Sequence, residues 1–157
     1  MHEEPRWLSD RERCAWQAYR QMFLLLNTQV ARDLAQDGGL SEPDYDVLSN
    51  LISSVGQRRR ISELADRMLW SRSRLSHHLA RMQKRSLVVR DECETDGRGA
   101  LVALTDEGMR TIEAAAAAHV ESVRKHFIDL LTAEQVDAFA TIGEVVIGRL
   151  TSAGDRP

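Results

Sequence analysis

The side chains best suited to binding nucleic acid lie between residues 71 and 85. Cationic and imidazole groups recur there at the spacing i, i+3, i+7, i+10: Arg74, His77, Arg81 and Lys84. That spacing places them on one stripe of a helix, because residues three and four apart are neighbours on a helical surface. Apolar residues occupy the other side at i, i+4, i+7: Leu75, Leu79 and Met82. The segment predicts an amphipathic helix with an apolar core face and a cationic outer face.

A helix of this kind suits the major groove of double-stranded DNA. Arginine can bind O6 and N7 of guanine with two hydrogen bonds, and serine and histidine can bind bases or phosphates. Residues near the start of such a helix usually reach base edges, so Ser73, Arg74 and His77 are the candidates for base recognition. Ser76 adds a hydroxyl to the same DNA-binding set. The expected phosphate contacts, which set register and not sequence, are Arg72, Arg81, Lys84 and Arg85.

The charge of the chain is strongly segregated. The 157 residues carry a formal charge of −3, which taken alone argues weakly against a nucleic-acid partner. Between residues 57 and 90, however, ten basic and two acidic residues give a net charge of +8, while the remainder carries −11. Charge runs are often only solvated surfaces, so the elements that carry these cations decide their meaning.

Two short helices in tandem are expected to position the cationic stripe. Ser62 is predicted to cap the first helix, and Ser71 to cap a second that runs to about residue 85. Such a pair joined by a brief connection is a helix-turn-helix, although the glycine that is usual in the turn is absent here. A short strand is expected just before the pair, at residues 60–61.

A β-hairpin is expected after the tandem, and long helices on either side of the whole region. Residues 87–90 and 100–104 are strand-like, and the glycine-rich segment 96–99 forms the turn between them. Arg98 lies at the tip, where it could enter a narrow minor groove. Capping residues at Ser9, Thr105 and Thr132 predict the starts of the long helices.

This order of elements resembles the MarR family of winged helix-turn-helix regulators. Three segments carry the likeness: residues 73–88, similar to the recognition helix and the entry to the wing; Asp96-Gly97-Arg98-Gly99, similar to the wing tip; and Leu104-Thr105-Asp106-Glu107-Gly108, similar to the start of the next helix. Each motif is weak alone, but they occur in the right order and the match covers most of the chain. Ser86 departs from the family, which commonly has glycine there.

The resemblance implies a mainly α fold with a small β-hairpin wing, in a single domain over residues 1–157. A winged helix-turn-helix core at 41–104 would bind DNA, and long terminal helices at 6–36 and 106–151 would form a homodimer. A two-fold protein predicts an inverted-repeat operator, and the expected role is that of a transcriptional repressor. The apolar stripes could instead bury one another within a monomer. The expected interface set is Trp7, Trp16, Phe127, Leu131, Phe139, Ile142 and Val146.

The resemblance also suggests two ways of sensing a signal. Relatives commonly bind small aromatic or phenolic anions, and Trp16, Tyr19 and Arg20, with Tyr45 on the second helix, could line such a pocket. The alternative is that these aromatic residues are simply core. Some relatives sense peroxide through a cysteine early in the first helix, and Cys14 is the candidate for such a thiol here.

Other classes of function find little support. The two adjacent histidines His77 and His78 point in different directions on a helix and cannot chelate one metal, so no metal site or cofactor is expected. No catalytic motif of a hydrolase or nucleotide-binding enzyme occurs. No apolar run is long enough for a membrane span, and the cysteine usage favours the cytoplasm. A helical adaptor that binds protein instead of DNA remains the alternative from another class.

Overall fold

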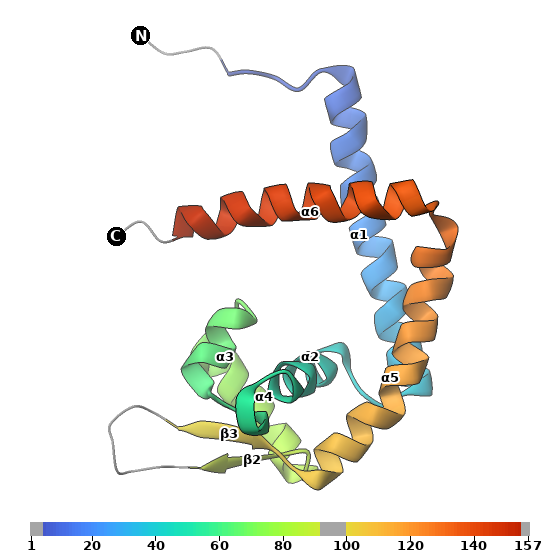
Figure 1. The fold of residues 1–157 in the computed structure, drawn as a ribbon. Helices are drawn as coiled ribbons and strands as arrows, with labels where there is room; N and C mark the ends of the chain where they lie inside the picture. Colours follow the sequence, from blue (N-terminus) through green and yellow to red (C-terminus); the bar gives the residue numbers. More distant parts are fainter. Residues whose placement is uncertain (1–4, 92–99, 155–157) are drawn as a thin grey trace. The chain divides into compact units, whose positions relative to one another are not determined.

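The helices and strands follow the order expected from the sequence. The computed structural model describes residues 5–91 and 100–154, and Figure 1 shows its ribbon. The helices are α1 (Asp10–Asp37), α2 (Glu42–Ile52), α3 (Ile61–Arg67), α4 (Arg72–Lys84), α5 (Asp106–His126) and α6 (Ala133–Gly154), with 3-10 turns η1 (Val55–Gln57) and η2 (Ile128–Leu130). The strands are β1 (Arg58–Arg60), β2 (Val88–Asp91) and β3 (Leu101–Leu104). The mainly helical fold with a small β component is confirmed.

The helices start where the capping residues indicate. Ser9 and Glu12 form a capping box at α1: the amide of Glu12 donates to Ser9 Oγ at 3.3 Å, and the amide of Ser9 donates to Glu12 Oε2 at 2.8 Å. At α4, Ser71 Oγ accepts from the amide of Arg74 at 3.2 Å. Both bonds satisfy amides that have no partner inside the helix, so the predicted starts of α1 and α4 are confirmed.

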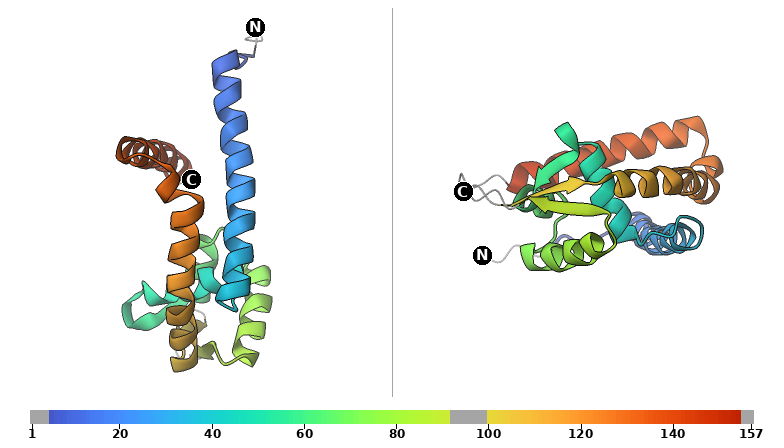
Figure 2. Two further views of the ribbon diagram at one scale, coloured as in Figure 1. Left: turned by 90° about the vertical axis from the view of Figure 1, so that its right-hand side faces the viewer. Right: turned by 90° about the horizontal axis from the view of Figure 1, so that it is seen from below.

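A small antiparallel sheet joins the helix-turn-helix to the hairpin. Within the described residues its strand order is β1-β3-β2. Val88 of β2 lies opposite Leu104 of β3, and the view from below in Figure 2 shows these two strands side by side. On the other side of β3, Arg59 of β1 lies opposite Val102. The predicted pairing of the hairpin strands is confirmed, and β1 extends the sheet to a third strand.

β1 leads directly into α3, and this changes how α3 begins. Arg60 ends β1 and is also the N-cap residue of α3. The amide of Ile61 donates to the carbonyl of Ala100 at 3.0 Å, so the backbone is bonded beside the sheet where the helix starts. The prediction that Ser62 caps this helix is wrong, because Ser62 already lies in its first turn.

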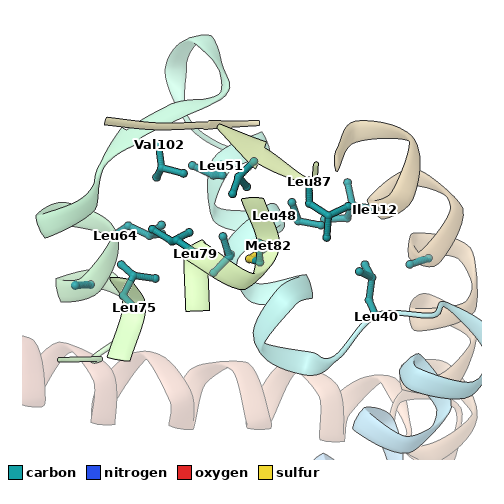
Figure 3. Packing of buried hydrophobic residues seen from close by; sticks show 14 of the residues in the cluster. Leu40, Leu48, Leu51, Leu64, Leu75, Leu79, Met82, Leu87, Val102 and Ile112 are labelled. Carbon is teal, nitrogen blue, oxygen red and sulfur yellow. The ribbon is translucent and has the colours of Figure 1, made fainter. Parts of the chain in front are cut away.

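One hydrophobic core holds α2, α3, α4, the sheet and the first part of α5 together. The labelled side chains in Figure 3 converge from these elements, and the largest ones are fully or almost fully buried. They include Leu48, Leu51, Leu64, Leu75, Leu79, Met82, Val102 and Ile112. Burial of a leucine-sized side chain contributes about 1.5–3 kcal/mol, so this core fixes α4 with its apolar face inward.

Helix α4 ends in a Schellman motif without the glycine that usually makes one. Ser86 has φ of 61°, in the left-handed region, and its amide donates to the carbonyl of Gln83 at 2.9 Å. The amide of Leu87 donates to the carbonyl of Met82 at 3.1 Å, which completes the motif. The sequence marked Ser86 as a departure from the family, and the structure shows that serine adopts the left-handed conformation there.

The turn between α3 and α4 is built the same way. Leu69 has φ of 53°, and its amide donates to the carbonyl of Asp66 at 3.2 Å. The amide of Trp70 donates to the carbonyl of Ala65 at 2.9 Å. Leucine thus occupies the position where the helix-turn-helix usually has glycine, at a conformational cost of about 1 kcal/mol. The missing glycine weakened the sequence prediction but does not alter the turn.

The start of α5 is docked onto the end of α4 through Thr105 and Gly108. Thr105 Oγ1 donates to the carbonyl of Ser86 at 2.5 Å and accepts from the amide of Gly108 at 3.0 Å. A Cβ atom added to Gly108 would lie 2.1 Å from the carbonyl oxygen of Leu87. Only glycine allows the first turn of α5 to approach the chain this closely, which gives the Leu-Thr-x-x-Gly motif a physical reason.

The residues divide into two units that are described separately. Residues 27–120 form one unit, which contains the core. The other comprises residues 1–26 and 121–157, and in it the rings of Phe127 and Phe139 pack edge to face at 5.1 Å. The left-hand view of Figure 2 shows α1 as one unbroken helix. No helix within residues 5–91 and 100–154 combines the length and apolarity that a bilayer crossing requires.

We expect Gly108→Ala to lower the free energy of unfolding by about 1–3 kcal/mol, because the new methyl group must displace the backbone at Leu87. Gly148→Ala is the matched control, since nothing lies within 4 Å of a Cβ there and alanine favours the helix. Urea denaturation followed by circular dichroism measures both variants. Equal losses in the two proteins would contradict the close approach at Gly108.

Candidate nucleic-acid interface

Helix α4 presents its predicted cationic face to solvent. Leu75, Leu79 and Met82 are fully buried, as the apolar spacing predicts. The polar side chains on the other side are exposed: Arg72, Ser73, Arg74, His77, Arg81 and Lys84. Because the core fixes the inner face, the outer face has a defined orientation and can enter a groove as a unit.

The start of α4 is electrostatically suited to an anionic partner. Ser71 is the N-cap, and the first turn contains no acidic residue but carries Arg72 and Arg74. The N-terminal end of a helix carries a partial positive charge from its unpaired amides. The two guanidinium groups add to that charge, so the end of the helix that is expected to reach base edges is positively charged.

Arg74 lies over the ring of Trp70, the residue directly before the cap. The guanidinium carbon is 3.9 Å from the ring centroid. Trp70 was not among the residues predicted for this site. In the sequence, only its position next to the capping serine indicates that it lies close to the start of α4.

Ser76 is less accessible than the other polar residues on the outer side of α4, and it is in contact with Arg90 of β2. Arg90 Nη2 donates to the carbonyl of Ser76 at 2.5 Å and to its hydroxyl at 3.3 Å. The side chain of Ser76 is half-buried in consequence. Its hydroxyl therefore connects α4 to the hairpin, a role that the sequence analysis did not predict for either residue.

A buried carboxylate anchors the end of α4 to α2. Asp44 is only 2% exposed, and both its oxygens accept from Arg85: Nη1 donates to Oδ2 at 2.9 Å, and Nη2 donates to Oδ1 at 2.5 Å. Asp44 also closes the capping box of α2 with Ser41. Arg85 was predicted as a phosphate contact, and the structure gives it a structural partner instead of a free guanidinium.

His78 completes the same network from the inner side of α4. Its Nε2 lies 3.0 Å from Asp44 Oδ1, and Nη2 of Arg81 lies 2.9 Å from its Nδ1. Since arginine can only donate, Nδ1 accepts and carries no proton, and the imidazole is neutral. The side chain is 8% exposed. His78 thus holds the guanidinium end of Arg81, although residue 81 as a whole is exposed.

The pKa values in this network follow from burial and charge. Burial raises the pKa of Asp44, but the hydrogen bonds and charge of Arg85, together with Ser41, outweigh it and hold the pKa below its usual value. Burial lowers the pKa of His78; Asp44 opposes this, and the charges of Arg81 and Arg85 reinforce it. At neutral pH the network therefore contains an ionised Asp44 and a neutral His78.

The residues predicted to bind a small ligand are divided between the two units, which are described separately. Trp16, Tyr19 and Arg20 line a depression formed along α1, and the rings of Trp16 and Tyr19 stack at 5.6 Å. Tyr45 lies in the other unit, where its ring packs against His119 at 4.4 Å. Every residue lining the depression comes from α1, so it offers one wall of a site and no enclosure.

Of the two remaining predicted site residues, the structure describes Cys14 but not Arg98. Cys14 is exposed on α1, and its redox role stays a prediction. Arg98 at the expected wing tip lies outside the described residues. Among the residues that are described, no group of three or more His, Cys, Asp or Glu side chains is placed to hold a metal ion.

Comparison with known sequences places the central part of the chain in a recognised group. Residues 38–99 match the profile described as the MarR family. The transcriptional regulator HosA of Escherichia coli O127:H6 is 30% identical over 122 residues, which cover 78% of this chain and 88% of that protein.

Two solved structures from Streptomyces coelicolor are similar over nearly the whole chain. The MarR family transcriptional regulator AbsC superposes with a TM-score of 0.86 at 41% identity, covering 94% of this chain and 99% of that one. The MarR family transcriptional regulator Sco3205, solved in complex with DNA, gives a TM-score of 0.87 at 36% identity, covering 96% and 98%.

We expect Arg85→Gln to lower the free energy of unfolding by about 2 kcal/mol, because the buried carboxylate of Asp44 loses its charged partner. The neighbouring change Lys84→Gln removes the same charge from an exposed side chain and should alter stability by less than about 0.5 kcal/mol. Urea denaturation of both variants separates the two roles. If Arg85→Gln is as stable as the wild type, the pairing with Asp44 does not stabilise the fold, and only the predicted phosphate contact remains for Arg85.

Acidification below pH 6.5 should destabilise the protein in a way that depends on His78. Because the pKa of His78 is lowered in the folded state, the unfolded chain binds a proton first as the pH falls through 6.5. The free energy of unfolding then decreases until the lowered pKa is reached. Denaturation curves between pH 7.5 and about 5 should show a shallower decrease for His78→Gln than for the wild type. Identical pH dependence in the two proteins would rule out this contribution.

Proposed function

Because this chain belongs to the MarR family of transcriptional regulators, we propose that it acts as a homodimeric repressor on an inverted-repeat operator. Its function is regulatory and not enzymatic, and double-stranded DNA is its partner. The single observation that carries the proposal is the exposed cationic face of α4, fixed from behind by the buried apolar face. We place the protein in the cytoplasm, where it has access to DNA.

The proposed contacts divide along α4 according to position. Ser73, Arg74 and His77, near the start of the helix, bind base edges in the major groove. Arg72, Arg81 and Lys84 bind phosphates and set the register. Arg98 binds in the minor groove beside the hairpin. Ser76 and Arg85, which already have partners in the fold, contribute to the interface by supporting α4.

The distribution of charge supports this assignment over a protein-binding adaptor. Residues 57–90 carry +8, and the rest of the chain carries −11. The acidic remainder is repelled by the phosphate backbone, so the chain approaches DNA with one surface and not with the others. Binding to a protein partner does not in general require so sharp a separation of positive and negative charge along the chain.

A homodimer is supported by exposed apolar side chains on α1 and α6 and just before α1. Trp7, which precedes α1, is 83% exposed, and Ile142 and Leu150 of α6 are 61% and 68% exposed in the single chain. Soluble monomers rarely leave large contiguous apolar surfaces in contact with water. We propose that a second copy of the chain covers this surface, which also includes Trp16, Phe139 and Val146.

An effector that changes the spacing of the two recognition helices would release the operator. We propose a small aromatic ligand bound against Trp16, Tyr19 and Arg20 on α1. Since one helix supplies a single wall, this site requires a second wall from the partner copy. The ring of Tyr45 packs against His119 in the other unit, and its part in a ligand site stays a prediction.

The proposal is tested by selecting bound fragments from a random pool of DNA duplexes with the purified protein. We expect an enriched inverted repeat whose half-sites are centred about 10 base pairs apart, one turn of the double helix. Binding to the enriched duplex should weaken steeply with salt, by about 0.9 log units per log unit of salt for each phosphate contact. Recovery of a non-palindromic sequence would contradict the homodimer, and recovery of none would contradict sequence-specific DNA binding.

A further inference from the structure

We propose that Trp70 is a positioning residue for DNA recognition: its indole holds Arg74 in the orientation that binds guanine in the major groove. The inference rests on the proposed function. It goes further because it names guanine as the base that Arg74 binds, and Trp70 as a residue that supports this contact without touching the base. It starts from the stacking of the Arg74 guanidinium on the Trp70 ring, with 3.9 Å between the guanidinium carbon and the ring centroid.

The indole is a fixed platform. The backbone of Trp70 is held by the Schellman motif that ends α3, in which its amide donates to Ala65. The side chain is partly buried and packs against the hydrophobic core. Its ring meets the ring of His78 edge to face at 5.6 Å, and His78 is only 6% exposed. Backbone, core and ring contact together restrict the orientations open to the indole.

Stacking orients the guanidinium without consuming its donors. Contact with an aromatic face uses the flat side of the group, whereas the N–H donors point outward in its plane. No side-chain hydrogen bond of Arg74 occurs within the described part of the chain, so those donors remain available. A planar pair of N–H donors matches O6 and N7 of guanine, which present two acceptors side by side in the major groove.

Two other arginines, one on α4 and one at its C-cap, are held differently. Arg85 binds Asp44 with two donors, and Arg81 is engaged by His78 through Nη2. Both use donors within the fold that a base would need. Arg74 alone among these three is held by its face and keeps its donors, and it lies in the first turn of α4, where base edges are reached.

Pre-orientation reduces the conformational freedom that Arg74 would otherwise lose on binding DNA. An exposed cation–π contact corresponds to about a two- to five-fold change in an equilibrium constant. We therefore expect Trp70→Leu to reduce the preference for the enriched duplex over a scrambled duplex by about two- to five-fold. Trp70→Phe, which keeps an aromatic face, should retain most of that preference.

The test is a double-mutant cycle with Trp70→Leu and Arg74→Ala, measured by fluorescence anisotropy on the duplex enriched by the wild type and on its scrambled version. In the Arg74→Ala background, Trp70→Leu should cause no further loss of preference, because the group that it orients is gone. Trp70→Leu with Lys84→Ala is the matched control, because Lys84 is exposed and, within the described residues, shares no contact with Trp70, and there the two losses should be independent. Thermal unfolding of each protein records any effect on folding.

The results distinguish a positioning role of Trp70 from a role in the stability of the fold alone. Non-additivity with Arg74 but not with Lys84, and rescue by phenylalanine, support the positioning role. Additive losses with Arg74, or equal losses on both duplexes, show that Trp70 acts only through the fold and overturn the inference. If Trp70→Leu is too unstable to measure, the same cycle is run with Trp70→Met, which fills more of the space and also lacks an aromatic face. A wild type that prefers no sequence overturns the proposed function, and this inference with it.

Discussion

The orientation of α4 depends on one buried carboxylate. Asp44 forms the capping box of α2 with Ser41, binds Arg85 at the end of α4 and lies 3.0 Å from His78, about two turns earlier. A buried charge is costly unless it is paired, and these partners come from both helices. The carboxylate is therefore satisfied only when α2 and α4 are in register. Apolar packing buries α4, and the polar network determines where along α2 it sits.

Local signals in the sequence predicted most of the fold. Capping residues marked the starts of α1 and α4, and apolar spacing identified the buried face of α4, because both depend on neighbours within a few positions. The error at Ser62 arose because β1 continues to the start of α3, so sheet pairing and not a side chain fixes that end. Prediction from capping residues considers only nearby side chains, so it cannot detect a strand that runs directly into a helix.

The sequence predicted which residues lie at the candidate site, but not which of them also bond to other parts of the fold. The exposed cations of α4 follow from its periodicity, but Arg85 meets a partner 41 positions away and Ser76 one 14 positions away. Contacts at such separations leave no periodic trace in one sequence. The same holds for Trp70, whose importance depends on a ring–cation distance. Two residues of the predicted set therefore also serve the fold, and their contacts with DNA stay a prediction.

The left-handed residues at the ends of α3 and α4 bear on how the domain folds. Neither Leu69 nor Ser86 favours that conformation by itself. An isolated pair of these helices would form its turns poorly, so the native turns gain stability only as the core assembles around them. The helix-turn-helix should for this reason appear together with the sheet in one kinetic step, without an early helical hairpin as an intermediate. The glycine-free turns make the recognition element cooperative with the domain that carries it.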